Sequence, residues 1–133
     1  MKPVLLALMF LSDDHCAQLS QSFDLIYAPD AAQATAAIAA HGPRITAVLT
    51  IGSTGLSVAQ IDALPQLSLI CALGAGYENI AVQHAKARGI VVANGAGTND
   101  DCVADHAWGL LIAAVRGIPK LDQLTRDGVW RTA

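Results

Sequence analysis

The sequence is poor in charged and aromatic residues and has no strong excess of either charge. Asp, Glu, Lys and Arg make up 14% of the 133 residues, aromatic residues make up 5%, and the formal net charge is −3. Without a basic run, the chain lacks the electrostatic attraction that drives binding to nucleic acids or to anionic membranes. We therefore expect neither kind of partner.

Cysteine and long apolar runs are also scarce. Cys16, Cys71 and Cys102 are an odd number without the spacing of a metal site, which is typical of reduced thiols in a cytoplasmic protein. No apolar run approaches the ~20 residues that span a bilayer. The run Val4–Leu11 follows Lys2 as the core of a signal peptide would, but acidic residues come next and no Ala-x-Ala cleavage site appears. This run favours a buried first strand.

Apolar residues are abundant, at 53% of the chain. A chain of this length can bury the core of one ordinary domain, and its low charge favours a compact sheet covered on both faces. The apolar fraction is high for a small domain, so we expect part of its surface to pack against something else.

Short apolar runs bounded by Gly, Pro or Asp alternate with helical stretches, which predicts successive βαβ units. The predicted strands are Val4–Phe10, Phe23–Tyr27, Ile45–Ile51, Leu67–Leu73 and Gly89–Ala93. The predicted helices are Asp14–Ser22, Ala31–His41, Ser57–Leu64 and Ile80–Arg88, with N-caps at Ser12 or Asp13, Asp30, Ser57, and Glu78 or Asn79. We expect an α/β fold, with a doubly wound parallel sheet in flavodoxin-like order.

The pattern changes after Gly97. A polar cluster at 98–101 predicts the start of a helix, and the apolar stretch Val103–Val115 predicts a helix buried on most of its faces. A more polar helix is expected at Lys120–Asp127. We therefore divide the chain into a flavodoxin-like domain at 1–96 and a second segment at 97–133.

Three glycine-containing turns follow predicted strands, at the sheet edge where open α/β folds bind ligands. Gly74-Ala75-Gly76 leaves two backbone N–H groups free to bind a carboxylate, or it is only a tight turn. Gly52-Ser53-Thr54-Gly55 either forms a pocket wall or caps the next helix. The third turn is Asn94–Gly97. None of the three turns has the Gly-x-Gly-x-x-Gly pattern of a dinucleotide-binding site.

Catalytic groups are harder to find. His15, His41, His84 and His106 lie in or beside predicted helices, and Asp105 next to His106 faces a different direction on its helix. We expect these histidines to be structural or solvated. A receiver domain would need an Asp at the end of the third strand, and a flavodoxin would need a hydroxyl-rich phosphate loop after the first; the chain has neither.

The continuation Tyr77-Glu78-Asn79-Ile80, with the order of the glycine turns, resembles the D-isomer-specific 2-hydroxyacid dehydrogenases, notably their glyoxylate/hydroxypyruvate reductase branch. The family pattern is Gly-Tyr-Asp-Asn-Ile-Asp, from which Glu78 departs conservatively and Ala81 more strongly. The resemblance implies a substrate domain followed by the first helices of a Rossmann domain. It also implies a cofactor, NAD or NADP, that transfers hydride to a 2-oxo acid.

The resemblance further implies roles for individual residues. The expected substrate-binding residues are Ser53, Thr54, Leu73, Gly74, Ala75 and Gly76. Asn99 and Asp100 are expected to contact the cofactor, although relatives often carry Thr at the position of Asp100. The family's catalytic Arg, acid and His lie later in its sequence, and no position here matches them, so no catalytic residue is expected within these 133 residues.

From these observations we expect the substrate-side domain of a cytoplasmic NAD(P)-dependent dehydrogenase acting on small 2-oxo or 2-hydroxy acids. The 133-residue chain is expected to be inert alone, and to form a homodimer through residues 103–130. The alternative is a non-catalytic α/β binding or interaction domain that retained the fold.

Overall fold

The structure is a computed structural model that describes residues 2–129. The chain divides into two compact units, Met1–Thr98 and Asn99–Ala133. The sequence pattern predicts this division two residues earlier, after residue 96. Trp130, part of the predicted dimer contact, lies outside the described residues.

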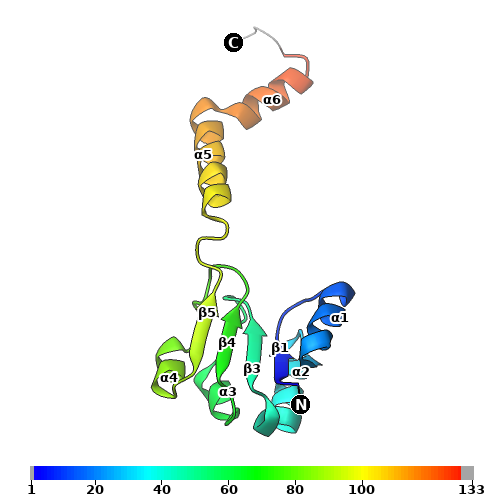
Figure 1. Cartoon of the computed structure of the whole chain (residues 1–133). Coiled ribbons are helices and arrows are strands. Elements are labelled where there is room, and N and C mark those ends of the chain that lie inside the picture. The colour runs from blue at the N-terminus through cyan, green and yellow to red at the C-terminus, as the bar shows by residue number, and fades with distance from the viewer. Residues whose placement is uncertain (1, 130–133) are drawn as a thin grey trace. The chain divides into compact units, whose positions relative to one another are not determined.

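The first unit is built on a five-stranded parallel sheet with the strand order β2-β1-β3-β4-β5. Figure 1 shows β1, β3, β4 and β5 side by side in this order. The strands are β1 (Val4–Ala7), β2 (Asp24–Tyr27), β3 (Ala47–Thr50), β4 (Leu69–Ala72) and β5 (Val91–Asn94). Leu5 of β1 lies between Leu25 of β2 and Ala47 of β3, so the order reverses at β1. This flavodoxin-like order confirms the predicted fold class.

Helices connect the strands, each at a predicted place. They are α1 (Asp13–Ser22), α2 (Ala31–His41), the short 3₁₀ helix η1 (Gly42–Arg44), α3 (Val58–Asp62) and α4 (Val82–Ala87). The first three α-helices have side-chain N-caps, at Ser12, Asp30 and Ser57. Each cap side chain accepts a hydrogen bond from the backbone N–H of the residue three positions later. Gln60 completes a capping box with Ser57.

Two apolar clusters lie on the two faces of the sheet. The larger cluster packs Leu6, Val48 and Ile70 of the central strands against residues of α2, α3 and α4, including Ile38 and Ile61. The smaller cluster joins Ala7, Met9 and Leu11 to Cys16 and Leu19 of α1. The core is therefore thick on one face of the sheet and confined to the β1–β3 region on the other.

Burial on both faces was predicted for every strand and is wrong for β2 and β5. Neither contains a buried residue, and Val91 of β5 is 61% exposed. Both are edge strands. On the face of the sheet that carries the smaller cluster, the helical residues come from α1, so Val91 has no helix over it in this chain. The apolar sequence of β5 alone does not distinguish an edge strand from a central one.

The predicted cap of the fourth helix is also wrong. Ala81, rather than Glu78 or Asn79, occupies the N-cap position of α4 and offers no side-chain cap. Asn79 is not available for capping because its side-chain amide donates to the carbonyl of Ser53. The turn after β4 therefore runs longer than the sequence pattern indicated.

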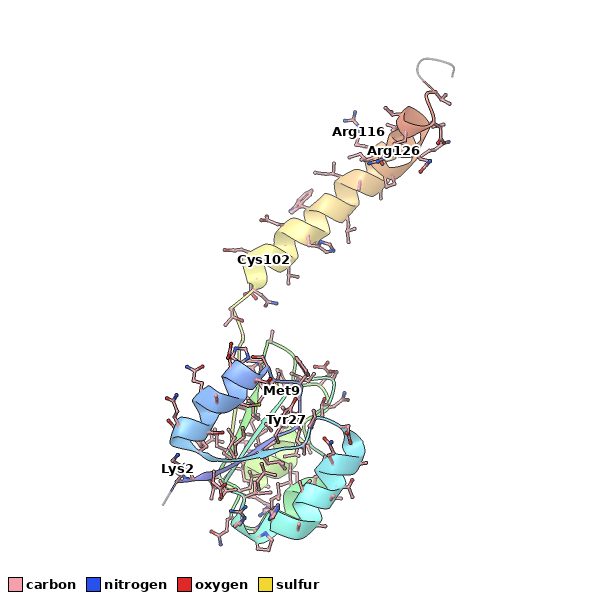
Figure 2. The ribbon with its side chains drawn as sticks, turned by 90° about the vertical axis from the view of Figure 1, so that its right-hand side faces the viewer. Lys2, Met9, Tyr27, Cys102, Arg116 and Arg126 are labelled. Carbon is pink, nitrogen blue, oxygen red and sulfur yellow. The ribbon has the colours of Figure 1, made fainter. Side chains whose placement is uncertain are left out.

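The second unit consists of α5 (Asp100–Arg116) and α6 (Ile118–Arg126). Gly117 joins them in the left-handed conformation, with φ of 62°, and Pro119 begins α6. No residue of α5 is buried in the single chain, although the sequence predicted a helix buried on most faces. Figure 2 shows its side chains projecting around the helix between Cys102 and Arg116.

Within residues 2–129, no helix combines the length and the hydropathy that crossing a bilayer requires.

Candidate functional site

Three turns at the carboxyl ends of β3, β4 and β5 form the candidate site. They comprise Gly52–Gly55, Gly74–Asn79 and Gly95–Thr98. Because the three strands are parallel neighbours, their carboxyl ends share one edge of the sheet. This is the edge at which α/β sheets bind ligands.

The turn after β3 is held by the buried side chain of Thr50, whose hydroxyl donates to the carbonyl of Gly55 at 2.9 Å. The N–H of Gly55 donates to the carbonyl of Ile51 at 2.8 Å. Gly55 has a φ of 68°, a conformation that an L-residue adopts only with strain. Ser53 and Thr54 are thus carried on a short, internally bonded turn.

Direct contacts join this turn to the turn after β4. The backbone N–H of Asn79 donates to the carbonyl of Gly52 at 3.3 Å, and its side-chain amide donates to the carbonyl of Ser53 at 2.9 Å. A Cβ added at Gly52 would lie 2.6 Å from the carbonyl carbon of Gly76. The structure therefore packs the turn that carries Ser53 against the turn that carries Gly76, at the sheet edge that the sequence predicted for both.

The turn after β4 is joined on its other side to β5. The N–H of Gly95 donates to the carbonyl of Gly74 at 2.8 Å, and the Asn94 side chain donates to the carbonyl of Ala75 at 2.7 Å. The N–H groups of Ala75 and Gly76 donate no hydrogen bond to any residue in 2–129. The carbonyls of Gly74 and Ala75 are thus bonded to the end of β5, while the N–H groups of Ala75 and Gly76 remain free to donate to a ligand.

Two separate pockets open along this edge. One of about 450 Å³ lies over the ends of β4 and β5, and its lining includes Leu73, Gly74 and Thr98. The other, of about 370 Å³, is lined by Thr54 together with Asp30 and residues at the ends of β1 and β2. The structure thus places Leu73 and Gly74 in one pocket and Thr54 in another.

Asn99 and Asp100, the predicted cofactor contacts, belong to the second unit. Asn99 is the N-cap residue of α5 and makes no side-chain capping bond, so its amide retains both donor and acceptor groups. Asp100 and Asp101 lie in the first turn of α5, where carboxylates interact favourably with the helix dipole.

One histidine has partners that sequence reasoning missed. His84 Nε2 lies 2.7 Å from Asp62 Oδ1, and the guanidinium of Arg88 lies 3.6 Å from the same oxygen. Arg88 also donates to the carbonyls of Ile61 and Leu64. These contacts join the end of α3 to α4, toward the amino ends of the strands and away from the three turns. Only the packing of consecutive helices on one face, which the βαβ pattern implies, could have indicated this pair.

No group of three or more His, Cys, Asp or Glu side chains in residues 2–129 is arranged to hold a metal ion. Cys16, Cys71 and Cys102 are all free thiols.

Comparison with known proteins places the chain among dehydrogenases. Residues 6–132 match the family model described as D-isomer specific 2-hydroxyacid dehydrogenase, catalytic domain. A glyoxylate reductase from Thermococcus kodakarensis is 37% identical over 87 residues, which cover 65% of this chain and 26% of the relative. A D-3-phosphoglycerate dehydrogenase from Archaeoglobus fulgidus is 36% identical over 88 residues, which cover 66% of this chain and 17% of the relative.

A solved structure shares the fold along almost the whole chain. It is an NADPH-dependent glyoxylate/hydroxypyruvate reductase from Sinorhizobium meliloti in complex with NADP and malonate, 29% identical with a TM-score of 0.79. The match covers 98% of this chain and 40% of that one. The chain spans about a quarter or less of the curated relatives named above. Because the family model covers nearly every residue, the chain belongs to the D-isomer specific 2-hydroxyacid dehydrogenase family.

Proposed function

We propose that this chain is the substrate-side part of an NAD(P)-dependent oxidoreductase that interconverts small 2-oxo acids, such as glyoxylate and hydroxypyruvate, with D-2-hydroxy acids. Family membership supports the reaction class, and the names of the Thermococcus and Sinorhizobium relatives support the substrates. The three free cysteines support a reducing compartment such as the cytoplasm.

The observation that carries the proposal is the free pair of N–H groups at Ala75 and Gly76. In this role they bind the carboxylate of the oxo acid, while Leu73 and Gly74 line the pocket beside it. Ser53, whose carbonyl accepts a hydrogen bond from Asn79, carries a hydroxyl on the neighbouring turn. Thr54 lines a different pocket, so in this proposal it does not contact the substrate and is only part of the turn that carries Ser53.

The nicotinamide cofactor, when bound, supplies the hydride. The donor and acceptor groups of the Asn99 side chain fit the carboxamide of a nicotinamide. Asp100 is the next residue in the sequence and the first residue of α5. In this proposal residues 1–96 form the substrate domain, and residues 97–133 form the crossing and the first helices of the NAD(P)-binding domain.

The 133-residue chain itself is proposed to be inert. Among residues 2–129 the His84–Asp62 pair lies toward the opposite edge of the sheet from the three turns, so it does not face the anion-binding N–H groups. No position among these 133 residues matches the family's catalytic Arg, acid or His, so in this proposal the proton comes from a group outside them.

The test is the steady-state oxidation of NADH or NADPH at 340 nm by the full-length gene product, with glyoxylate or hydroxypyruvate as substrate. We expect turnover by the wild type, and a KM for the oxo acid at least about tenfold higher in Gly76→Val, because a branched side chain blocks approach to the N–H pair. The nearest atom that a Cβ at Gly76 meets is the end of the flexible Glu78 side chain, so this variant is expected to fold.

Circular dichroism of Gly76→Val provides the control for folding. An unchanged KM in a folded variant contradicts the role of the turn. An absence of turnover by the wild type with either acid and either cofactor contradicts the oxidoreductase and favours the alternative, a non-catalytic binding domain of the same fold.

A further inference from the structure

Two consecutive residues at the end of β5 hold the turn after β4 by its carbonyl groups. The backbone N–H of Gly95 donates to the carbonyl of Gly74 at 2.8 Å. The side-chain amide of Asn94 donates to the carbonyl of Ala75 at 2.7 Å. Two successive peptide groups of the turn, Gly74–Ala75 and Ala75–Gly76, are therefore bonded through their oxygens to the same strand end.

The geometry of the peptide group turns each of these contacts into an orientation of an N–H group. Both peptide groups are trans, and in a trans peptide group the C=O and the N–H lie in one plane and point in opposite directions. Because the carbonyls of Gly74 and Ala75 face the end of β5, the N–H groups of Ala75 and Gly76 face away from it. The hydrogen bonds from β5 thus fix the direction of both N–H groups.

The two hydrogen bonds differ in how they depend on the sequence. The bond from Gly95 uses the backbone and continues the ladder in which Asn94 pairs with Ala72, so no side chain is needed for it. The bond from Asn94 uses a side chain, and within residues 2–129 that side chain is the only donor to the carbonyl of Ala75. The orientation of the Gly76 N–H therefore depends on one side chain.

The backbone at Gly76 would not hold this orientation by itself. Glycine adopts a wider range of φ and ψ than any other residue, so the Ala75–Gly76 peptide group can rotate where nothing holds its oxygen. A ligand that needs the Gly76 N–H would then have to order this peptide group on binding, which lowers its affinity. An asparagine supplies the required donor without placing a charge beside a carboxylate ligand.

We infer that Asn94 is a positioning residue of the proposed reaction, because its side-chain amide directs the Gly76 N–H toward the carboxylate of the oxo acid. The inference rests on the proposed function, since it takes the N–H groups of Ala75 and Gly76 as the carboxylate site. Asn94 acts through the peptide group and does not contact the substrate. Loss of its hydrogen bond is expected to weaken carboxylate binding by about three- to tenfold, the range that one hydrogen bond contributes.

The first experiment follows the 133-residue chain, labelled with ¹⁵N and ¹³C, by NMR spectroscopy with glycolate as the probe. In the wild type, glycolate is expected to shift the amide resonances of both Ala75 and Gly76. Asn94→Ala should shift the carbonyl ¹³C resonance of Ala75 without any ligand, because that oxygen loses its donor. It should also raise the Kd of glycolate by about three- to tenfold.

The two amides provide an internal comparison within the Asn94→Ala variant. The shift that saturating glycolate induces should shrink at Gly76 and persist at Ala75, because the bond from Gly95 to Gly74 remains. A general loss of structure would affect both amides alike. Gln83→Ala removes an exposed side-chain amide from α4 that makes no hydrogen bond within residues 2–129, and this matched control should leave the shifts and the Kd unchanged.

The outcomes separate the inference from the proposed function. An unchanged Kd in Asn94→Ala, or an equal loss of the induced shift at Ala75 and Gly76, overturns the role of Asn94 and leaves the carboxylate site intact. An absence of glycolate shifts at both amides of the wild type overturns the carboxylate site and the inference with it.

The second experiment measures steady-state kinetics of the full-length gene product with glyoxylate or hydroxypyruvate. Asn94→Ala is expected to raise the KM for the oxo acid by about three- to tenfold and to leave the KM for NADH or NADPH and the thermal midpoint unchanged. A rise confined to the KM for the cofactor overturns the inference. A lack of turnover by the wild type counts against the proposed reaction, while the glycolate measurements still decide the inference.

Discussion

At the scale of single residues, Gly52 is a position of the candidate site that leaves no room for a side chain. It is buried, and a Cβ added there would lie 2.6 Å and 2.8 Å from the carbonyl carbon and oxygen of Gly76. Real Cβ atoms do not approach a backbone so closely, so the turns after β3 and β4 would have to separate. The backbone of one turn thus depends on the absence of a side chain in the other.

We therefore expect Gly52→Ala to lower the free energy of unfolding of the chain by about 1–3 kcal/mol, measured by urea denaturation. The control is Gln18→Ala, at an exposed position inside α1, where alanine is the better helix former. That control should change the free energy of unfolding by less than about 0.5 kcal/mol. A neutral Gly52→Ala would show that the two turns are not packed as described.

The residues of the candidate site differ in how far sequence alone could place them. Gly74–Gly76 and Ser53 were predicted at one sheet edge because parallel strands end together, and the two turns that carry them are in contact. The assignment of Thr54 to a separate pocket depends on how the turn bends back toward β1. The position of the Glu78 carboxylate depends on long-range packing that local patterns do not encode.

At the scale of elements, α3 is the helix most dependent on its cap. It has five residues, too few to be stable through its own hydrogen bonds. Ser57 and Gln60 form a reciprocal capping box that satisfies two N–H groups at its start. Because α3 also carries the fully buried Ile61, loss of the cap is coupled to the main core.

Ser57→Ala is expected to destabilise the chain by about 1 kcal/mol, seen as a lower midpoint of thermal or urea unfolding. The control is Ser20→Ala, which removes an exposed hydroxyl that donates to the carbonyl of Cys16 within α1. That substitution should change stability by less than about 0.5 kcal/mol. If both variants lose the same stability, the capping box is not the source of the effect.

Cap positions also show what the sequence could predict about the elements. Ser12, Asp30 and Ser57 were predicted from a short polar side chain just before a helical pattern, and each accepts the expected hydrogen bond. The same rule failed at α4, because Asn79 forms hydrogen bonds to the neighbouring turn instead. A propensity rule fails where a tertiary contact uses the same side chain.

At the scale of the whole molecule, the apolar surface of α5 and α6 requires an explanation. In the single chain the large exposed apolar residues of this unit are Val103, Trp108, Leu110, Leu111, Ile112, Val115, Ile118, Leu121 and Val129. Each is between 41% and 74% exposed. A free-standing chain rarely leaves so continuous an apolar helix in water.

We propose that this surface forms the contact of a two-fold homodimer. A two-fold contact pairs the same helix from each copy, so every apolar residue counts twice in the buried area. Covering several such side chains is worth roughly 1.5–3 kcal/mol each, which is enough to hold two copies together at micromolar concentration.

Light scattering coupled to size-exclusion chromatography should therefore give about twice the 13.8 kDa chain mass at tens of micromolar. Leu111→Glu is expected to shift the chain toward the monomer, because a carboxylate at the centre of the contact would lose its hydration without gaining a partner. Val58→Glu, which adds the same charge to an exposed position of α3, is the matched control and should leave the dimer intact. A monodisperse wild-type monomer would contradict the dimer, and would mean that α5 and α6 are covered by another part of the enzyme.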